Sequence, residues 1–428
     1  MQKKARHQSP SLKLALGFLV FILIGTFLLF LPISHQEGKS LSFIDSLVLA
    51  TSAVCVTGLT PVDLSQTLSY FGSTVMMVLF QIGGLGYSVI AVTLIALSSR
   101  KVDLLNRGIL RDSLISDNRM DIMFLLKFTL ATTFLIEAIG ALLLFMGFYG
   151  DMSTPRAVYV AIFTSLAAFN NAGFDLFSTS LVSYYDSPLV ILTVAGLIIC
   201  GGLGFVIYLE AMNHRKGKKF SLHFKVVLMM TAILLLAGTL LFRLTMPVNL
   251  LNAFFQSVTT RTAGFFSYDQ SMLSNAAIVL TIILMYIGAS PGSTGGGIKT
   301  TTFFVSFKAG FSIITGRNPS SFKRSLGYDV IMKALILIVL SIMLCTLGFL
   351  IMTITDPDIA PIKLLYETVS AFGTVGLSMA VTAELSIGGK LIIIILMYAG
   401  RVGILTLISV FSRKARQAKY VEEKVAIG

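Results

Sequence analysis

The chain has 428 residues, of which 55% are hydrophobic and only 12% are charged, and its net charge at pH 7 is +13. Soluble proteins carry roughly 25% charged residues, so this composition excludes an ordinary soluble domain and indicates several membrane crossings. Three widely spaced cysteines and four histidines without metal-ligand spacing give no sign of a disulfide framework or a metal centre, and no catalytic cluster suggests an enzyme.

Eight long apolar segments, taken in chain order, are each predicted to form a membrane helix, because helices satisfy their own backbone hydrogen bonds in lipid. They cover residues 12–33, 70–98, 122–148, 186–211, 222–246, 275–315, 328–355 and 387–412. A shorter, half-apolar segment lies within each successive pair, at 43–56, 156–169, 248–261 and 361–373. About 14 residues at about 1.5 Å each cannot cross roughly 30 Å of hydrocarbon. These short segments are therefore predicted to be re-entrant pore helices.

The short segments end in related sequences, each with a glycine followed by a large apolar residue. In chain order they are SAVCVTGLT (52–60), AAFNNAGFD (167–175), VTTRTAGFF (258–266) and SAFGTVGLS (370–378). The sequence thus predicts an all-α polytopic membrane protein of four helix–pore helix–helix repeats around a pseudo-fourfold pore. The predicted parts are repeat 1 (12–98), repeat 2 (122–211), repeat 3 (222–315), repeat 4 (328–412) and a cytoplasmic tail (413–428).

The four glycines are expected to line the pore. A potassium ion must shed water in a narrow filter, where rings of backbone carbonyls replace its hydration shell. Glycine permits the backbone angles that aim successive carbonyls at one axis, and the negative end of each preceding helix points toward the cation. Glycines that only allow close helix packing are the alternative. Four of them, each at the end of a segment too short to span, favour the pore.

An irregular stretch, IGASPGSTGGGIKT (287–300), interrupts the sixth long segment. Pro291 and its glycines cannot sustain a regular helix, so this stretch must be buried in protein or line a cavity. The spacing of Gly292 and Gly297 matches the glycine spacing of a phosphate-binding loop. However, Ile298 intervenes before Lys299 and no strand leads into the stretch, which argues against nucleotide binding.

Lys and Arg residues indicate the orientation in the membrane. Most of them fall in the N-terminus, 100–119, 215–225, 317–324 and 413–424, and only four lie in the opposite loops: Lys39, Arg156, Lys363 and Lys390. Because cytoplasmic loops carry the excess of positive charge, both termini are predicted to be cytoplasmic. This distribution explains the basic charge without a nucleic-acid partner.

With its four glycine motifs and the opening PISHQEGKSLSFIDSLVLATSAVCVTGL, the chain resembles the Ktr/Trk/HKT superfamily of potassium translocators, in particular the KtrB type, over residues 10–412. The resemblance implies that K+ is the transported ion, bound by filter carbonyls. It assigns the filter to Val56, Thr57 and Gly58; Asn171, Ala172 and Gly173; Thr262, Ala263 and Gly264; and Thr374, Val375 and Gly376.

The resemblance also implies that residues 288–300 form an intramembrane gate beneath the filter, with Arg401 as part of the barrier. The assigned loop residues are Gly288, Ser290, Gly292, Ser293, Thr294, Gly295, Gly296 and Gly297. It further implies a homodimer in the cell membrane, a cytosolic nucleotide-binding RCK ring of the KtrA type, Na+ as an activator, and no organic cofactor in this chain. The basic stretches 100–121 and 212–225 and the tail 413–428 are the expected docking surface for that ring or for anionic lipid.

Several alternatives stay open at this point. A secondary transporter of another cation or small solute would place its substrate pocket between broken helices. Arg401 is either part of the barrier or a structural arginine that binds loop carbonyls, and Glu137 is either an ion site or an inter-helix hydrogen-bond acceptor. Arg261 is expected to point behind the filter toward Glu367. Members of the family that this chain resembles tend to pass sodium when serine replaces the first of the four glycines, so glycine at all four positions, Gly58 included, favours potassium.

Overall fold

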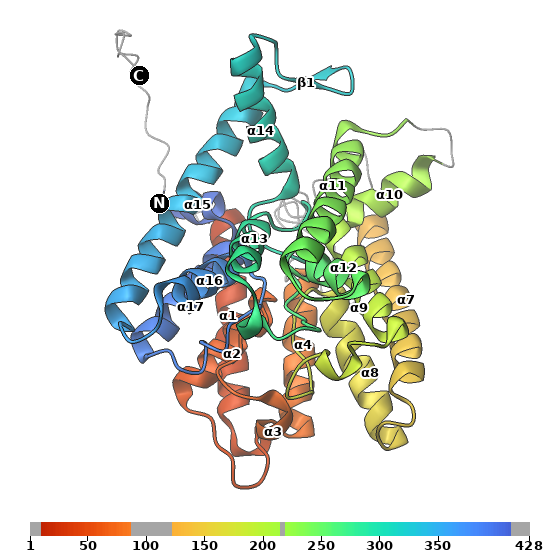
Figure 1. Cartoon of the computed structure of the whole chain (residues 1–428), viewed down its shortest axis with the longest axis vertical. Coiled ribbons are helices and arrows are strands. Elements are labelled where there is room, and N and C mark those ends of the chain that lie inside the picture. Colours follow the sequence, from red (N-terminus) through yellow and green to blue (C-terminus); the bar gives the residue numbers. More distant parts are fainter. Residues whose placement is uncertain (1–9, 87–121, 215–218, 412–428) are drawn as a thin grey trace, which may run out of the picture.

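The computed structural model describes residues 10–86, 122–214 and 219–411, and within them the chain is almost entirely helical (Figure 1). The predicted segment 87–98, the loop 100–121 and the tail 413–428 lie outside the described residues. A hairpin of two-residue strands, β1 (Ser320–Ser321) and β2 (Arg324–Ser325), is a small departure from the all-α prediction.

The helices fall into four groups along the chain. The first two groups are α1 (Pro10–Phe30), α2 (Phe43–Cys55), α3 (Leu64–Thr67) and α4 (Tyr70–Leu85), then α7 (Ile122–Phe148), α8 (Thr154–Phe169), α9 (Pro188–Leu203) and α10 (Phe205–His214). The third group is α11 (Leu222–Thr245), α12 (Leu250–Thr259), α13 (Asn275–Tyr286) and α14 (Thr300–Thr315). The fourth is α15 (Tyr328–Thr355), α16 (Pro361–Gly373), α17 (Ile387–Val402) and α18 (Ile404–Phe411). Three single 3₁₀ turns lie in the loops, at Pro32–Ser34, Val182–Tyr184 and Gln270–Met272.

Four described helices are long and apolar enough to cross a membrane, namely Leu12–Phe30, Leu126–Phe148, Leu222–Thr245 and Tyr328–Thr355. Their outward side chains are apolar and exposed, as at Leu236 (73%) and Ile354 (72%). A surface of this kind faces lipid in a membrane protein. The chain is therefore a multi-pass membrane protein.

The prediction of continuous helices over 186–211 and 387–412 is wrong. The first is broken between α9 and α10, which meet at an angle of 84°, and the second is broken between α17 and α18. Gly204 and Gly403 stand at the two breaks with φ of 90° and 89°, a conformation that costs a residue with a Cβ about 1–2 kcal/mol. At the first break Phe205 N donates a hydrogen bond to Gly292 O (3.1 Å) in place of a helical bond.

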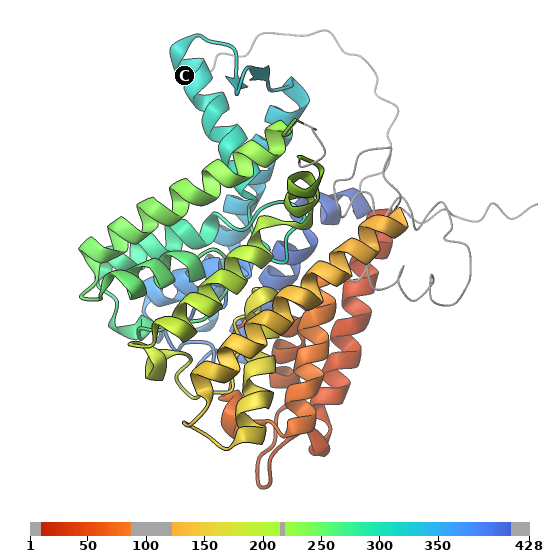
Figure 2. The same cartoon turned by 90° about the vertical axis from the view of Figure 1, so that its right-hand side faces the viewer.

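The four groups form a closed ring. The helix that follows each short helix contacts the short helix of the next group: α4 meets α8, α9 meets α12, α13 meets α16, and α17 meets α2. The chain-order colours accordingly pass around the molecule from red to blue (Figures 1 and 2), and α1 packs against α17 and α18. Tyr398 Oη bonds Ala15 O (2.7 Å), and Lys390 Nζ pairs with Asp45 Oδ1 (2.8 Å) across this closure.

Candidate functional site

The short helices α2, α8, α12 and α16 each lead into a three-residue segment, and these are named the four glycine segments: 56–58, 171–173, 262–264 and 374–376. All four share an alternating backbone. The first residue of each has a positive φ, at Val56 (57°), Asn171 (56°), Thr262 (75°) and Thr374 (49°). The last residue of each segment also has a positive φ, at Gly58 (100°), Gly173 (69°), Gly264 (82°) and Gly376 (92°). The middle residue of each segment does not have a positive φ. Such alternation brings successive carbonyls onto one side of a strand, the arrangement that carbonyl filters use.

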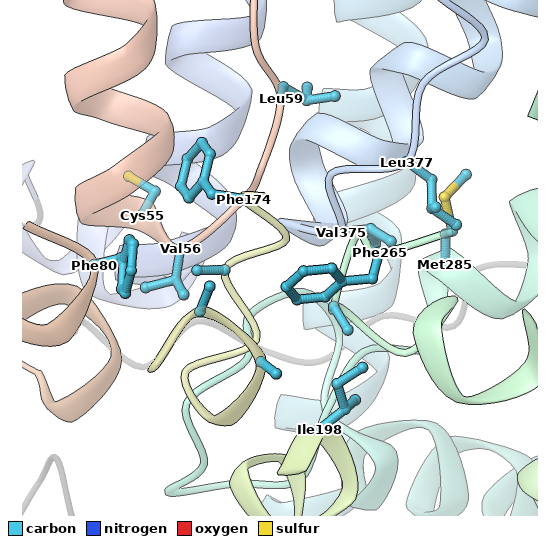
Figure 3. Close-up of a cluster of buried hydrophobic side chains, with 14 of the residues drawn as sticks. Cys55, Val56, Leu59, Phe80, Phe174, Ile198, Phe265, Met285, Val375 and Leu377 are labelled. Atoms are coloured by element: carbon cyan, nitrogen blue, oxygen red, sulfur yellow. The ribbon is translucent and has the colours of Figure 1, made fainter. Parts of the chain in front are cut away.

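The glycine segments form a closed ring in chain order. A Cβ placed on each glycine would meet the carbonyl oxygen of the middle residue in the next segment. The contacts run from Gly58 to Ala172 (2.6 Å), Gly173 to Ala263 (2.7 Å), Gly264 to Val375 (2.6 Å) and Gly376 to Thr57. The large apolar residue after each glycine is buried in the hydrophobic core, and Figure 3 labels these four side chains: Leu59, Phe174, Phe265 and Leu377. All twelve residues predicted for the filter are thus brought together.

Two serines that the sequence analysis did not single out brace the first and fourth glycine segments. Ser52 Oγ accepts from Gly58 N (3.0 Å), and Ser370 Oγ accepts from Gly376 N (3.1 Å). Each serine stands six residues before its glycine, so the aligned motifs contained the signal. The corresponding residues of the other two segments are Ala167 and Val258, which offer no hydroxyl.

We expect Ser370→Ala to lower the free energy of unfolding by about 1–3 kcal/mol, because the change leaves the Gly376 N–H buried without an acceptor. Denaturant unfolding of the purified protein measures this effect. Thr239→Ala is the matched control, because its hydroxyl donates to Leu235 O of its own helix, away from the glycine segments. Equal stability of both variants would contradict the role of the brace.

The glycine-rich loop (287–299), between α13 and α14, lies against the residues that begin the glycine segments. Thr294 Oγ1 donates to Phe169 O (3.1 Å). A Cβ on Gly295 would meet Thr262 Oγ1, and one on Gly296 would meet Thr374 Oγ1. Of the loop residues predicted for the gate, those from 294 to 297 therefore lie against the ends of the short helices and the first residues of the glycine segments. A Cβ on Gly292 would meet no atom within 4 Å.

Backbone hydrogen bonds and one serine hydroxyl hold this loop to itself and to the end of α9. Gly288 N donates to Ile298 O (2.8 Å), and Ser293 Oγ donates to Ser290 O (2.6 Å). Ser290 N and Thr294 N donate to Gly202 O (3.1 Å) and Gly201 O (3.3 Å). The loop is thus ordered by many single hydrogen bonds, not by a helix.

Two cations bind the carbonyls of this loop. Arg401 donates to Thr294 O from one guanidinium nitrogen and to Gly83 O and Gly84 O (3.3 Å to Gly84) from another, so it joins the loop to α4. Lys299 Nζ donates to Gly295 O (2.7 Å). The sequence analysis considered Lys299 only as part of a possible phosphate-binding loop. Its contact with Gly295 O could not be predicted from its neighbours along the chain.

Glycines in the helices that follow the glycine segments allow close packing against the short helices. A Cβ on Gly83 would collide with Val54 O, one on Gly201 with Phe169 O, and one on Gly400 with Phe372 O. Each of these helices therefore touches the carbonyl end of a short helix.

The predicted pairing of Arg261 with Glu367 is wrong. Glu367 instead accepts hydrogen bonds from Ser378 (2.7 Å) and Thr382, two residues that follow the fourth glycine segment. Arg261 is buried, and its Nε has no hydrogen-bond partner in the described part of the chain. Arg261 belongs to the third group of helices and Glu367 to the fourth, and Glu367 finds its hydrogen-bond partners within its own group.

A cavity of about 320 Å³ opens on the side of the ring away from the glycine-rich loop. Its lining includes all four segment glycines and three carboxylates, Asp63, Asp175 and Asp269. Burial raises the pKa of Asp175 to about 7, against the opposing effect of a hydrogen bond from Phe177 N. A negatively charged mouth over a ring of carbonyls attracts cations.

Comparison with known proteins gives a consistent result. A family model for TrkH, described as a cation transport protein, matches residues 2–423. The chain is 39% identical to Ktr system potassium uptake protein B of Bacillus subtilis, over 98% of this chain and 97% of that protein. It is 37% identical to potassium/sodium uptake protein NtpJ of Enterococcus hirae, over 100% and 99%. The crystal structure of the potassium transporter TrkH from Vibrio parahaemolyticus superposes with a TM-score of 0.76, at 19% identity, over 96% of this chain and 87% of that one.

Proposed function

Since the chain belongs to the TrkH family of cation transport proteins, we propose that it is the membrane subunit of a potassium uptake system and that its four glycine segments form the selectivity filter. The observation that carries the proposal is the closed ring in which each segment glycine faces a carbonyl oxygen of the next segment. In that arrangement carbonyls from four strands replace the hydration shell of one ion. The four groups of helices are then four repeats, with α2, α8, α12 and α16 as re-entrant pore helices.

The glycine-rich loop is the proposed gate. It lies beneath the ring and consists largely of residues with small side chains, so it can be displaced without disturbing a helix. Arg401 is then both a tether of the loop and a positive charge in the ion path, which combines the two roles that the sequence left open. Intramembrane charges of this kind are costly and are kept for function.

The assembly proposed for the chain follows the Ktr naming of its relatives, which implies a system of several components. We infer a homodimer in the cell membrane, docked on a cytosolic RCK ring through the basic stretches 100–121 and 212–225 and the tail 413–428, with both termini cytoplasmic. We also propose that Na+ stimulates potassium uptake by this assembly.

Potassium uptake in a bacterial strain that lacks its own uptake systems tests the transported ion. We expect the chain, expressed with an RCK partner, to restore growth and 86Rb+ uptake at limiting potassium. Absence of rescue by protein that is present in the membrane would point to a secondary transporter of another cation or a small solute.

Uptake is expected to depend on external pH through Asp175. Its carboxyl is neutral below a pKa of about 7 and charged above it, so acidification removes a negative charge from the mouth of the filter. Lowering the external pH from 8 to 6 should reduce uptake at limiting potassium roughly 2- to 5-fold. Asp175→Asn should have low uptake with little pH dependence. A wild-type pH profile in that variant would contradict the assignment.

A further inference from the structure

Behind the second glycine segment lies a buried carboxylate that the proposed transport does not use. Glu137 of α7 is only 2% exposed, and no ion pair involves it in the described part of the chain. Its carboxylate is instead held by amides. Gln81 Nε2 of α4 donates to both oxygens (2.9 and 3.1 Å), and Asn170 Nδ2 donates to one of them (3.1 Å).

Asn170 connects this cluster to the filter backbone. It caps α8 and directly precedes Asn171, the first residue of the second glycine segment. Its Nδ2 also donates to Gln81 Oε1 (2.6 Å) and to Leu166 O (2.8 Å). A Cβ on Gly84 would collide with this side chain, so α4 confines Asn170 as well as bonding it. Glu137, Gln81 and Asn170 therefore form one hydrogen-bonded unit from three helices.

The second segment needs such a unit because it lacks the brace found in the first and fourth. Ser52 and Ser370 accept hydrogen bonds from the glycine N–H of their segments, but the corresponding residue of the second segment is Ala167. The third segment has another brace, in which Thr259 Oγ1 donates to Phe265 O (2.5 Å). Each segment is thus fixed from behind by different side chains.

We propose that Glu137 is a positioning residue for ion selectivity, which acts through Gln81 and Asn170 to hold the second filter strand in place. The inference rests on the proposed function. A carboxylate suits this position because it only accepts hydrogen bonds, and both neighbouring amides present N–H groups to it. An amide in its place presents an NH2 group to one of those donors and leaves the strand less firmly held.

The experiment compares K+ with Na+ in Glu137→Gln. We expect the preference for K+ over Na+, measured as the ratio of 86Rb+ uptake to 22Na+ uptake, to fall about tenfold. The melting temperature of the purified protein should lose its rise in K+ relative to Na+. A purely structural role would reduce the amount of folded protein and uptake of every ion alike, without changing either ratio.

Two further variants sharpen the result. The exchange Gln81→Glu with Glu137→Gln restores one carboxylate beside Asn170 Nδ2, and we expect it to recover most of the selectivity. Ser165→Ala is the matched control, because within the described residues Ser165 Oγ bonds the Glu137 backbone carbonyl (2.7 Å) and not its carboxylate. Unchanged selectivity in Glu137→Gln, or no recovery in the exchange variant, would overturn the inference. A wild-type protein without K+ preference would instead refute the proposed function.

Discussion

Gly376→Ser is expected to abolish potassium-selective uptake while the protein remains in the membrane. At φ of 92° any residue with a Cβ carries about 1–2 kcal/mol of strain. The added Cβ would also meet Thr57 O, and it would lie 2.9 Å from Gly58 Cα of the neighbouring segment. Together these effects should reduce uptake at limiting potassium by at least about 100-fold, since each 1.4 kcal/mol corresponds to a factor of ten. Uptake of 86Rb+ per amount of membrane protein measures the effect.

Gly196→Ala is the control for the loss of a glycine. Gly196 lies within α9, where a Cβ would meet no atom within 4 Å, and alanine favours the helix by about 1 kcal/mol. That variant should transport as the wild type does. Transport by Gly376→Ser at the wild-type rate and selectivity would remove the fourth segment from the filter.

Arg401→Ala is expected to increase ion flux through the protein when no regulatory partner is present. The substitution removes the hydrogen bonds that join Thr294 O of the glycine-rich loop to Gly83 O and Gly84 O. Hydrogen bonds to charged groups are worth about 1.5–3 kcal/mol, so the displaced loop should become about 10-fold or more populated. If the proposed gate is right, a positive charge also leaves the ion path. Potassium flux into proteoliposomes at a fixed potential measures the change.

Arg243→Ala provides the comparison for this experiment. Arg243 is an exposed cation in the last turn of α11, away from the loop. Flux through that variant should match the wild type. If Arg401→Ala instead reduced flux, with the protein folded, the guanidinium would support conduction and the barrier role would be wrong.

The short helices were predictable from sequence because their length and their glycines are local features. The expected segments 43–56 and 361–373 correspond to Phe43–Cys55 and Pro361–Gly373. The irregular stretch around Pro291 was predictable for the same reason, since an internal proline and five glycines within residues 287–300 strongly disfavour a regular helix. Local sequence determines these elements, and the tertiary packing preserves them.

The helix breaks were not predictable because the same residue type behaves differently in different surroundings. Gly196 continues α9, whereas Gly204, eight residues later, ends it. The difference lies in the bond from Phe205 N to Gly292 O, a contact between segments about ninety residues apart. No pattern within 186–211 contains that information.

The side-chain partners in the site could not be predicted for a related reason. The expected pair Arg261 and Glu367 assumed that buried opposite charges meet, but Glu367 is satisfied by nearby hydroxyls in the fourth group. Glu137 finds its partners in α4 and α8, which only the order of helices around the ring brings together. The sequence indicates that these buried charged side chains need hydrogen-bond partners, but only the fold identifies those partners.

The position of a bound cation tests the carbonyl filter most directly. Crystals of the purified protein grown with RbCl allow Rb+ to be located by its anomalous X-ray scattering. We predict a peak enclosed by the carbonyl oxygens of segments 56–58, 171–173, 262–264 and 374–376, which weakens in Gly376→Ser. A protein that transports Rb+ but shows no peak between the four segments, with Rb+ bound elsewhere, would contradict the account.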